Sequence, residues 1–351
     1  MHIIPEFSFF SMSAPPPAVS PEEQAKIGQI QDFTGVGPDQ ARGLLLMSSW
    51  DVEKAASAYF EDSSAGIGVT DSSSVVDPAF NDEVTNQFNA IKQDIASSQP
   101  LLTELMDVAP LVTEFMPESG FARKIPALSA AYPCMRRARG DGNCFYRSFA
   151  FGYLERLLLD RDTVEITRMQ AVLARLKEEL AKQGNDASLV EEFCGFWVKS
   201  LDDIEKNLMS PAALGKQFNE GDFPTYGVFF LRLATQAEMV ERSEFFAPFC
   251  FEEASVAKFC EKNVAPAGEE AEQVQIIAMS DALGVPVKVV YVDDSPSDKA
   301  VEHVFEASAH RGAGGVRKTA AGAGAGSIVT LLYRPGHYDV LYEAGNPACA
   351  K

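Results

Sequence analysis

The strongest constraint on this chain is a pair of short segments that lie far apart in the sequence. Residues 141–147 read DGNCFYR, in which an Asp-Gly-Asn turn delivers Cys144 to the start of a predicted helix. Residues 337–339 read HYD and fall in a strand-like stretch. A cysteine attacks as its thiolate, which needs a neighbouring base or positive charge. The two segments therefore predict a cleft in which a thiol from a helix faces an imidazole from a strand.

The segment that follows Cys144 has the apolar spacing of a buried helix. Its apolar residues recur every fourth position, as Phe145, Phe149, Tyr153 and Leu157. A helix N-terminus presents unpaired N–H groups and a partial positive charge, which favour a thiolate. Gly142 relieves the turn and would let a substrate backbone approach closely. Free amides of the turn could hold an oxyanion, so Gly142 and Asn143 are candidate substrate-binding residues.

The histidine segment is predicted to lie on the second of two strands. Residues 328–333 and 337–342 have strand character, and residues 334–336 form a tight turn between them. Because strand side chains alternate faces, His337 and Asp339 share one face. His337 would then be the general base and acid, and Asp339 its orienting carboxylate.

A thiol and a histidine arranged in this way are typical of a papain-type cysteine hydrolase. Taken singly, a cysteine at a helix start is more often a small buried apolar residue, and a histidine in a strand is more often structural. On the residues alone, the catalytic and structural interpretations stay balanced.

The same segments resemble a known family. Residues 141–147 resemble the nucleophile motif of the otubains, the deubiquitinating cysteine peptidases of the ovarian-tumour (OTU) class, and residues 333–339 resemble their histidine motif. Residues 229–233 are similar to the central region of that family, and residues 91–116 to its helical lead-in. The likeness covers residues 83–345, which we predict to be one catalytic domain.

The resemblance implies an α+β, papain-like OTU fold with a helical lobe and a small mixed or antiparallel sheet. It implies that Cys144 is the nucleophile, His337 the base and Asp339 the third member, with Asp141 on the oxyanion side of the site. The implied reaction is hydrolysis of isopeptide bonds between ubiquitin and lysine side chains, through a thioester on Cys144. Neither a cofactor nor a metal is expected.

Two stretches depart from the family pattern. Residues 264–267 read VAPA where otubains carry an acidic residue, and residues 310–326 form a Gly/Ala-rich insertion. Neither includes a predicted catalytic residue. Elsewhere helices are expected over residues 161–180, 189–208, 224–234, 238–251 and 270–284, and a strand over 285–292.

A separate small domain is predicted at residues 20–62. A helix start at Ser20 and two further apolar helical segments indicate three short helices, which resemble a ubiquitin-associated (UBA)-like domain. Phe33, in its first loop, is either a contact for the apolar patch of ubiquitin or a core residue. Residues 1–19 and 346–351 are expected to be tails, and residues 63–82 a flexible linker.

Composition limits the kinds of partner that the protein can bind and the cellular compartment in which we expect it. The formal net charge of −20 argues against nucleic-acid binding, which needs clustered Lys and Arg. The acidity either attracts a basic protein surface or only maintains solubility. Six cysteines without a paired spacing, and no signal peptide or long apolar run, predict a reduced protein of the cytoplasm, or of the nucleus as well.

Three functions stay open at this point. The first is a deubiquitinase. The second is a non-catalytic adaptor that binds ubiquitin or a ubiquitin-conjugating enzyme and inhibits ubiquitination. The third is a general cysteine peptidase or a transglutaminase-like transferase.

Overall fold

The computed structural model describes residues 99–250, 253–307 and 329–349, and residues 26–28, 30, 31, 41 and 45 near the N-terminus. The chain divides into two compact units, Met1–Val69 and Thr70–Lys351. In the first unit the described residues are helical. Four hydrophobic side chains among them are buried, as the predicted first and second helices require: Ile27, Ile30, Ala41 and Leu45. Phe33, the third helix, the first tail and the linker lie outside the described residues.

The strands of the second unit form one mixed sheet of six strands in the order β1-β2-β6-β5-β3-β4. Their bounds are β1 Met106–Asp107, β2 Cys134–Arg136, β3 Val287–Tyr291, β4 Val301–Phe305, β5 Val329–Arg334 and β6 His337–Tyr342. Neighbouring strands are antiparallel except β3 and β5, which are parallel. The strand that carries the histidine motif therefore lies inside the sheet, between β2 and β5.

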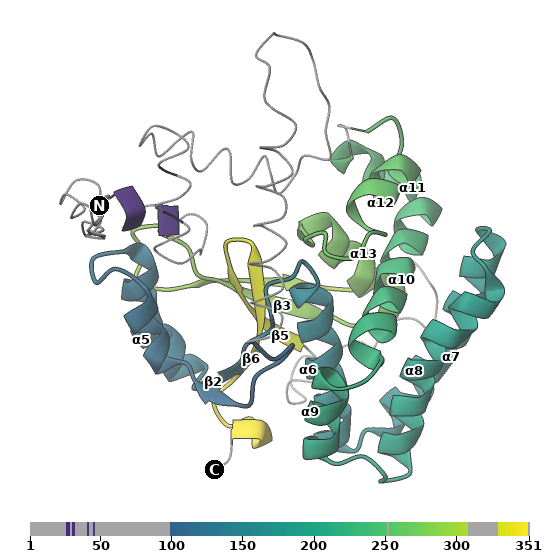
Figure 1. Ribbon diagram of the computed structural model, residues 1–351, viewed down its shortest axis with the longest axis horizontal. Coiled ribbons are helices and arrows are strands. Elements are labelled where there is room, and N and C mark those ends of the chain that lie inside the picture. The colour runs from purple at the N-terminus through teal and green to yellow at the C-terminus, as the bar shows by residue number, and fades with distance from the viewer. Residues whose placement is uncertain are drawn as a thin grey trace, which may run out of the picture. The chain divides into compact units, whose positions relative to one another are not determined.

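Helices cover both faces of this sheet (Figure 1). The α-helices are α5 Gly120–Ala131, α6 Cys144–Asp160, α7 Thr163–Lys182, α8 Ala187–Glu205, α9 Pro211–Asn219, α10 Val228–Glu241, α11 Ser243–Phe246, α12 Val256–Asn263 and α13 Gln273–Leu283. Shorter turns are the 3-10 helices η1 Ala109–Glu114, η3 Ala247–Phe249 and η5 Pro347–Cys349, and the π-helix η2 Phe223–Gly227. No helix within the described residues combines the length and the apolar character that a membrane crossing needs.

Alternation along the strands divides the core between the two faces. On β6, Tyr338 and Val340 pack into the large cluster with helices α6 to α10 and α13, whereas Leu341 packs with α5 on the other face. The predicted stripe of α6 lies in the large cluster, with all four members buried: Phe145, Phe149, Tyr153 and Leu157. The α+β architecture expected from the sequence is confirmed. It places the start of α6 beside the first residues of β6.

Several predicted elements are confirmed and others need correction. Strand β6 has the predicted bounds, and α13 ends at Gly284 in the left-handed conformation (φ 65°) that favours glycine. The helix predicted from residue 161 begins at Thr163 instead, because Asp162 is its N-cap and accepts a hydrogen bond from the Glu165 amide.

The helical lead-in predicted over residues 91–116 was wrong within the described residues. The described part of the lead-in, residues 99–116, is a short strand and a 3-10 helix, because its amides pair with the chain that precedes the cysteine; Thr103 N–H donates to Arg137 O at 2.8 Å. The stretches predicted as helices over 224–234 and 238–251 are helical but divided differently. The π-helix η2 leads into α10, which runs unbroken to Glu241, and α11 and η3 follow. Buried apolar residues continue across the expected gap, as Ala237 and Met239 show.

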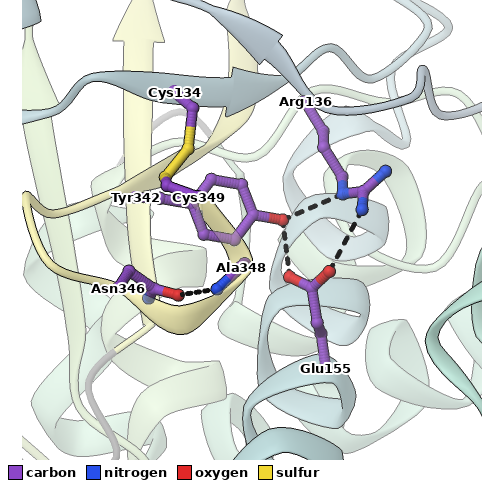
Figure 2. Close-up of a disulfide and its surroundings, with 7 residues drawn as sticks. All are labelled: Cys134, Arg136, Glu155, Tyr342, Asn346, Ala348 and Cys349. Carbon is purple, nitrogen blue, oxygen red and sulfur yellow. Dashed lines mark hydrogen bonds and ion pairs between the residues drawn. A yellow bond between two sulfur atoms is a disulfide. The ribbon is translucent and has the colours of Figure 1, made fainter. Parts of the chain in front are cut away.

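A disulfide joins Cys134 in β2 to Cys349 in η5, residues separated by 215 positions (Figure 2). The prediction that all six cysteines are reduced is therefore wrong for this pair, because spacing along the chain does not reveal which residues meet in space. The other four are free: Cys144, Cys194, Cys250 and Cys260. The compartment in which the protein works stays a prediction.

Three polar side chains form a hydrogen-bonded triangle beside the disulfide (Figure 2). The Tyr342 hydroxyl donates to Glu155 at 2.6 Å and accepts from Arg136 Nε at 3.1 Å, and Arg136 Nη2 lies 3.3 Å from the same carboxylate. Burial raises the pKa of Glu155, although the hydrogen bonds from Tyr342 and Arg136 oppose this. The triangle ties α6 to β2 and β6, so the helix that carries the cysteine is anchored to the strand that carries the histidine.

We expect Cys349→Ser to lower the free energy of unfolding of the oxidised protein by about 2–5 kcal/mol, because the cross-link restricts the unfolded chain. Urea unfolding of oxidised wild type and variant measures the difference. The control is the same comparison in dithiothreitol, where the two proteins should be equally stable. Equal stability in the absence of a reductant would contradict the prediction.

Candidate active site

Cys144 is the first residue of α6 and is 3 % exposed. The preceding turn depends on Gly142, whose φ of 72° lies in the left-handed region. The Asn143 side chain does not cap the helix. The first N–H groups of the helix have no partner within it, and they place a partial positive charge at the sulfur.

His337 is the first residue of β6. Its ring is hydrogen-bonded to Asp339 and lies close enough to Cys144 to interact with it. Its Nε2 lies 2.8 Å from Asp339 Oδ1, so the two residues share a face as predicted. Nδ1 points to the chain before the cysteine, where a Cβ built on Gly140 would lie 3.5 Å from it. Burial alone would lower the pKa of His337, but the Asp339 carboxylate and the hydrogen bond with Cys144 raise it to about 10.

Asp339 is completely buried and accepts hydrogen bonds from three groups. Besides His337, its Oδ1 accepts from the Ala138 amide at 3.0 Å, and its Oδ2 accepts from Arg334 Nη2 at 2.7 Å. Burial would raise the pKa of this carboxyl, but the positive charges of His337 and Arg334 hold it well below its usual range. Asp339 therefore stays ionised and fixes the orientation of the imidazole.

Asp141 lies in the turn before the cysteine, and its carboxylate is engaged by its own neighbours. The two terminal nitrogens of the buried Arg147, Nη1 and Nη2, donate to it at 3.0 and 2.7 Å, and the Asn143 amide donates at 3.1 Å. The carboxylate thus shapes the turn that leads into α6. Its predicted place on the oxyanion side would follow from that shaping of the backbone.

The two candidate substrate-binding residues of the turn contact a second loop of the protein, residues 264–270, which we name the covering loop. A Cβ built on Gly142 would lie 1.7 Å from Gly268 O, so the close backbone approach at Gly142 is made by the covering loop. The Asn143 side chain accepts from the Gly268 amide at 3.3 Å. The third candidate, Phe33, lies outside the described residues.

Four charged residues of the site were not predicted to act there: Arg147, Arg232, Glu270 and Arg334. Glu270 ends the covering loop, and its carboxylate lies 3.4 Å from where a Cβ on Gly336 would stand, at the turn before His337. Burial raises the pKa of Glu270, although His337 opposes this. Strand pairing could have identified Arg334, which is opposite His337 in the β5–β6 register. Arg147 and Arg232 lie within the segments 141–147 and 229–233 that resemble the family, whereas no sequence pattern marks Glu270.

Metal ligands do not gather in this part of the chain. Within residues 99–250, 253–307 and 329–349, no three His, Cys, Asp or Glu side chains are placed to hold an ion. The groups that meet at the start of α6 are a thiol, an imidazole and a carboxylate. Together they can perform nucleophilic acyl transfer.

Comparison with known proteins agrees with this geometry. Residues 94–343 match the family model for Peptidase C65 otubain, and residues 24–66 match that for a UBA-like domain. The chain is 34 % identical over 275 residues to ubiquitin thioesterase OTUB1 of Homo sapiens, which covers 78 % of this chain and 94 % of that protein. It is 33 % identical over 269 residues to an ovarian tumor domain-containing deubiquitinating enzyme of Arabidopsis thaliana, covering 74 % and 86 %.

Solved structures show the same fold. A complex of h/ceOTUB1 with ubiquitin aldehyde and UBC13~Ub superposes with a TM-score of 0.64 at 29 % identity, over 76 % of this chain and 99 % of that one. The corresponding complex with UBCH5B~Ub has the same values. The predicted family resemblance is therefore confirmed: the chain belongs to the otubain family of C65 cysteine peptidases and carries a UBA-like domain before its peptidase domain.

Proposed function

We propose that this protein is a deubiquitinase that hydrolyses the isopeptide bond between the C-terminal glycine of ubiquitin and a lysine amine. The observation that carries the proposal is the contact of His337 with both Cys144 and Asp339 at the N-terminus of α6. Relatives named ubiquitin thioesterases, and relatives solved with ubiquitin aldehyde, support ubiquitin as the acyl group.

In the first half of the reaction, the Cys144 thiolate attacks the carbonyl carbon of the ubiquitin glycine. The oxyanion that forms lies against the free N–H groups at the start of α6. When the intermediate collapses, the C–N bond breaks and the leaving amine takes a proton from His337 Nδ1. A thioester between ubiquitin and Cys144 remains.

In the second half, neutral His337 removes a proton from water, and the resulting hydroxide attacks the thioester carbonyl. The C–S bond breaks, the ubiquitin carboxyl group leaves, and the thiolate and the imidazolium are restored. Asp339 keeps Nε2 engaged throughout, so that Nδ1 faces the reacting atoms. Arg334 and the Ala138 amide keep Asp339 itself in place.

A second candidate function, binding of a ubiquitin-conjugating enzyme, is favoured by a separate surface. Four half-buried rings on α8, η2 and α10 form what we name the aromatic surface: Phe193, Phe196, Tyr226 and Phe229. Phe193 lies 5.3 Å from the rings of both Tyr226 and Phe229. Clusters of partly exposed aromatic rings are typical of protein interfaces. Relatives solved with UBC13~Ub and UBCH5B~Ub support a conjugating enzyme as the occupant.

For the hydrolase, we expect ubiquitin carrying a C-terminal thiol-reactive electrophile to label Cys144 of the folded protein, because this thiol has the paired imidazole. Mass spectrometry of the adduct identifies the residue. Cys144→Ala should abolish labelling, whereas the matched control Cys194→Ser, which changes a buried free thiol on α8, should label like wild type. Labelling at a different cysteine, or none, would end the proposal.

For the base, we expect His337 to carry protons on both ring nitrogens at about pH 8, because Asp339 and Cys144 raise its pKa. Nitrogen NMR can test this, since the chain has four histidines. Asp339→Asn should leave the ring neutral at that pH. Since the pKa is raised from 6.5 to about 10, the resulting stabilisation is complete below pH 6.5 and is lost as the pH approaches 10. A neutral ring in wild type at about pH 8 would contradict the assignment.

For the aromatic surface, we expect Phe193→Arg to weaken binding of a ubiquitin-charged conjugating enzyme at least about tenfold, because a central ring is lost and a charge is introduced. Hydrolysis of di-ubiquitin should change less than about twofold. Leu208→Arg, at an exposed position just beyond α8, is the control and should change neither. Equal loss of binding and hydrolysis in Phe193→Arg would argue against a separate docking surface.

A further inference from the structure

Arg232, in the middle of α10, is 1 % exposed and donates five hydrogen bonds to the loops around the cysteine. Its Nε and Nη2 donate to Asn143 Oδ1 at 3.1 and 2.7 Å. Nη2 also donates to Gly142 O at 2.9 Å and Glu269 O at 2.7 Å, and Nη1 donates to Val264 O at 3.0 Å. One planar group therefore joins the turn before the cysteine to both ends of the covering loop.

The acceptors of Arg232 are all uncharged oxygens, and within the described residues no carboxylate accepts from it. The guanidinium carbon lies 4.6 Å from the centre of the Tyr146 ring, two residues after Cys144. Burial lowers the pKa of Arg232, although Tyr146, Glu269 and Cys144 oppose this. Burying a charge costs desolvation free energy, which hydrogen bonds to neutral loop oxygens repay poorly. We therefore look for the role of Arg232 in the loop geometry that it fixes.

That role follows from the peptide that joins Gly142 to Asn143. Arg232 binds its carbonyl oxygen, and the Asp141 carboxylate binds its N–H group at 3.1 Å. The peptide is thus held from both sides, which fixes the direction in which the chain enters α6. The same guanidinium holds the covering loop, whose Gly268 lies against Gly142 and whose Glu270 lies beside the turn of His337.

We propose that Arg232 is a positioning residue that couples the covering loop to the cysteine turn, so that the placement of one loop sets the geometry of the other. The inference rests on the proposed function, because the turn that it positions carries the nucleophile. A lysine could supply the charge, but its single ammonium cannot span the four acceptor groups that a planar guanidinium reaches. The spanning geometry, and not the charge alone, is what the proposal requires.

The test compares Arg232→Lys with wild type on ubiquitin joined to a fluorescent amine. We expect kcat to fall about 100-fold, as when an oxyanion donor is lost, with KM changed less than about threefold. Active-site titration with the ubiquitin electrophile normalises both proteins to folded enzyme. The matched control is Arg168→Lys, a half-buried arginine of α7 that binds Glu165 and the Leu283 carbonyl away from the site, and kcat should be unchanged.

A second variant keeps the inference testable if the lysine protein fails to fold. Asn143→Ala removes the shared acceptor and leaves the buried charge in place, and we expect a similar fall in kcat. Where both variants fold, their losses should not add in the double variant, because they break the same link. Full kcat in a folded Arg232→Lys protein, or full kcat in Asn143→Ala, would overturn the inference. Inactive wild type that does not label at Cys144 would instead overturn the proposed function.

Discussion

The site depends on one buried carboxylate. Asp339 has no exposed surface and could not remain ionised there without the amide, guanidinium and imidazole groups that surround it. In the proposed mechanism, its charge keeps His337 protonated, and the imidazolium stabilises the Cys144 thiolate that attacks the substrate. The β5–β6 pairing brings Arg334 and His337 opposite each other, so pairing within the sheet supplies two of the groups that surround the Asp339 carboxylate.

Three arginines with little exposed surface order the segments around the cysteine of this acidic protein. Arg147 binds the Asp141 carboxylate, Arg334 binds Asp339, and Arg232 binds only neutral oxygens. Arg147 and Arg232 each join a helix to a segment without regular secondary structure, whereas Arg334 joins β5 to β6. Loops have few ways to hold a defined conformation, and a planar donor with several N–H groups is well suited to that purpose. Positively charged arginines therefore surround Cys144, although the net charge of the whole chain is −20.

Local patterns predicted much of the fold and the central members of the site. Strand alternation placed His337 and Asp339 on one face, the four-residue stripe after Cys144 predicted α6, and Gly284 marked the end of α13. What could not be predicted depends on distant pairing. The Cys134–Cys349 bridge, the strand within the lead-in and the bonds of Arg232 all join residues that local propensity treats independently. The roles of the site residues remain our proposals.

The position of β6 has a consequence for the order in which the protein matures during synthesis. It is the last strand along the described chain, yet it occupies the interior of the sheet between β2 and β5. A nascent chain in which α6 has already emerged from the ribosome would contain Cys144 but would not yet have His337 in the sheet. Contacts between such distant segments form late, after the loops between them have closed. We therefore expect peptidase activity only after this final strand has entered the sheet.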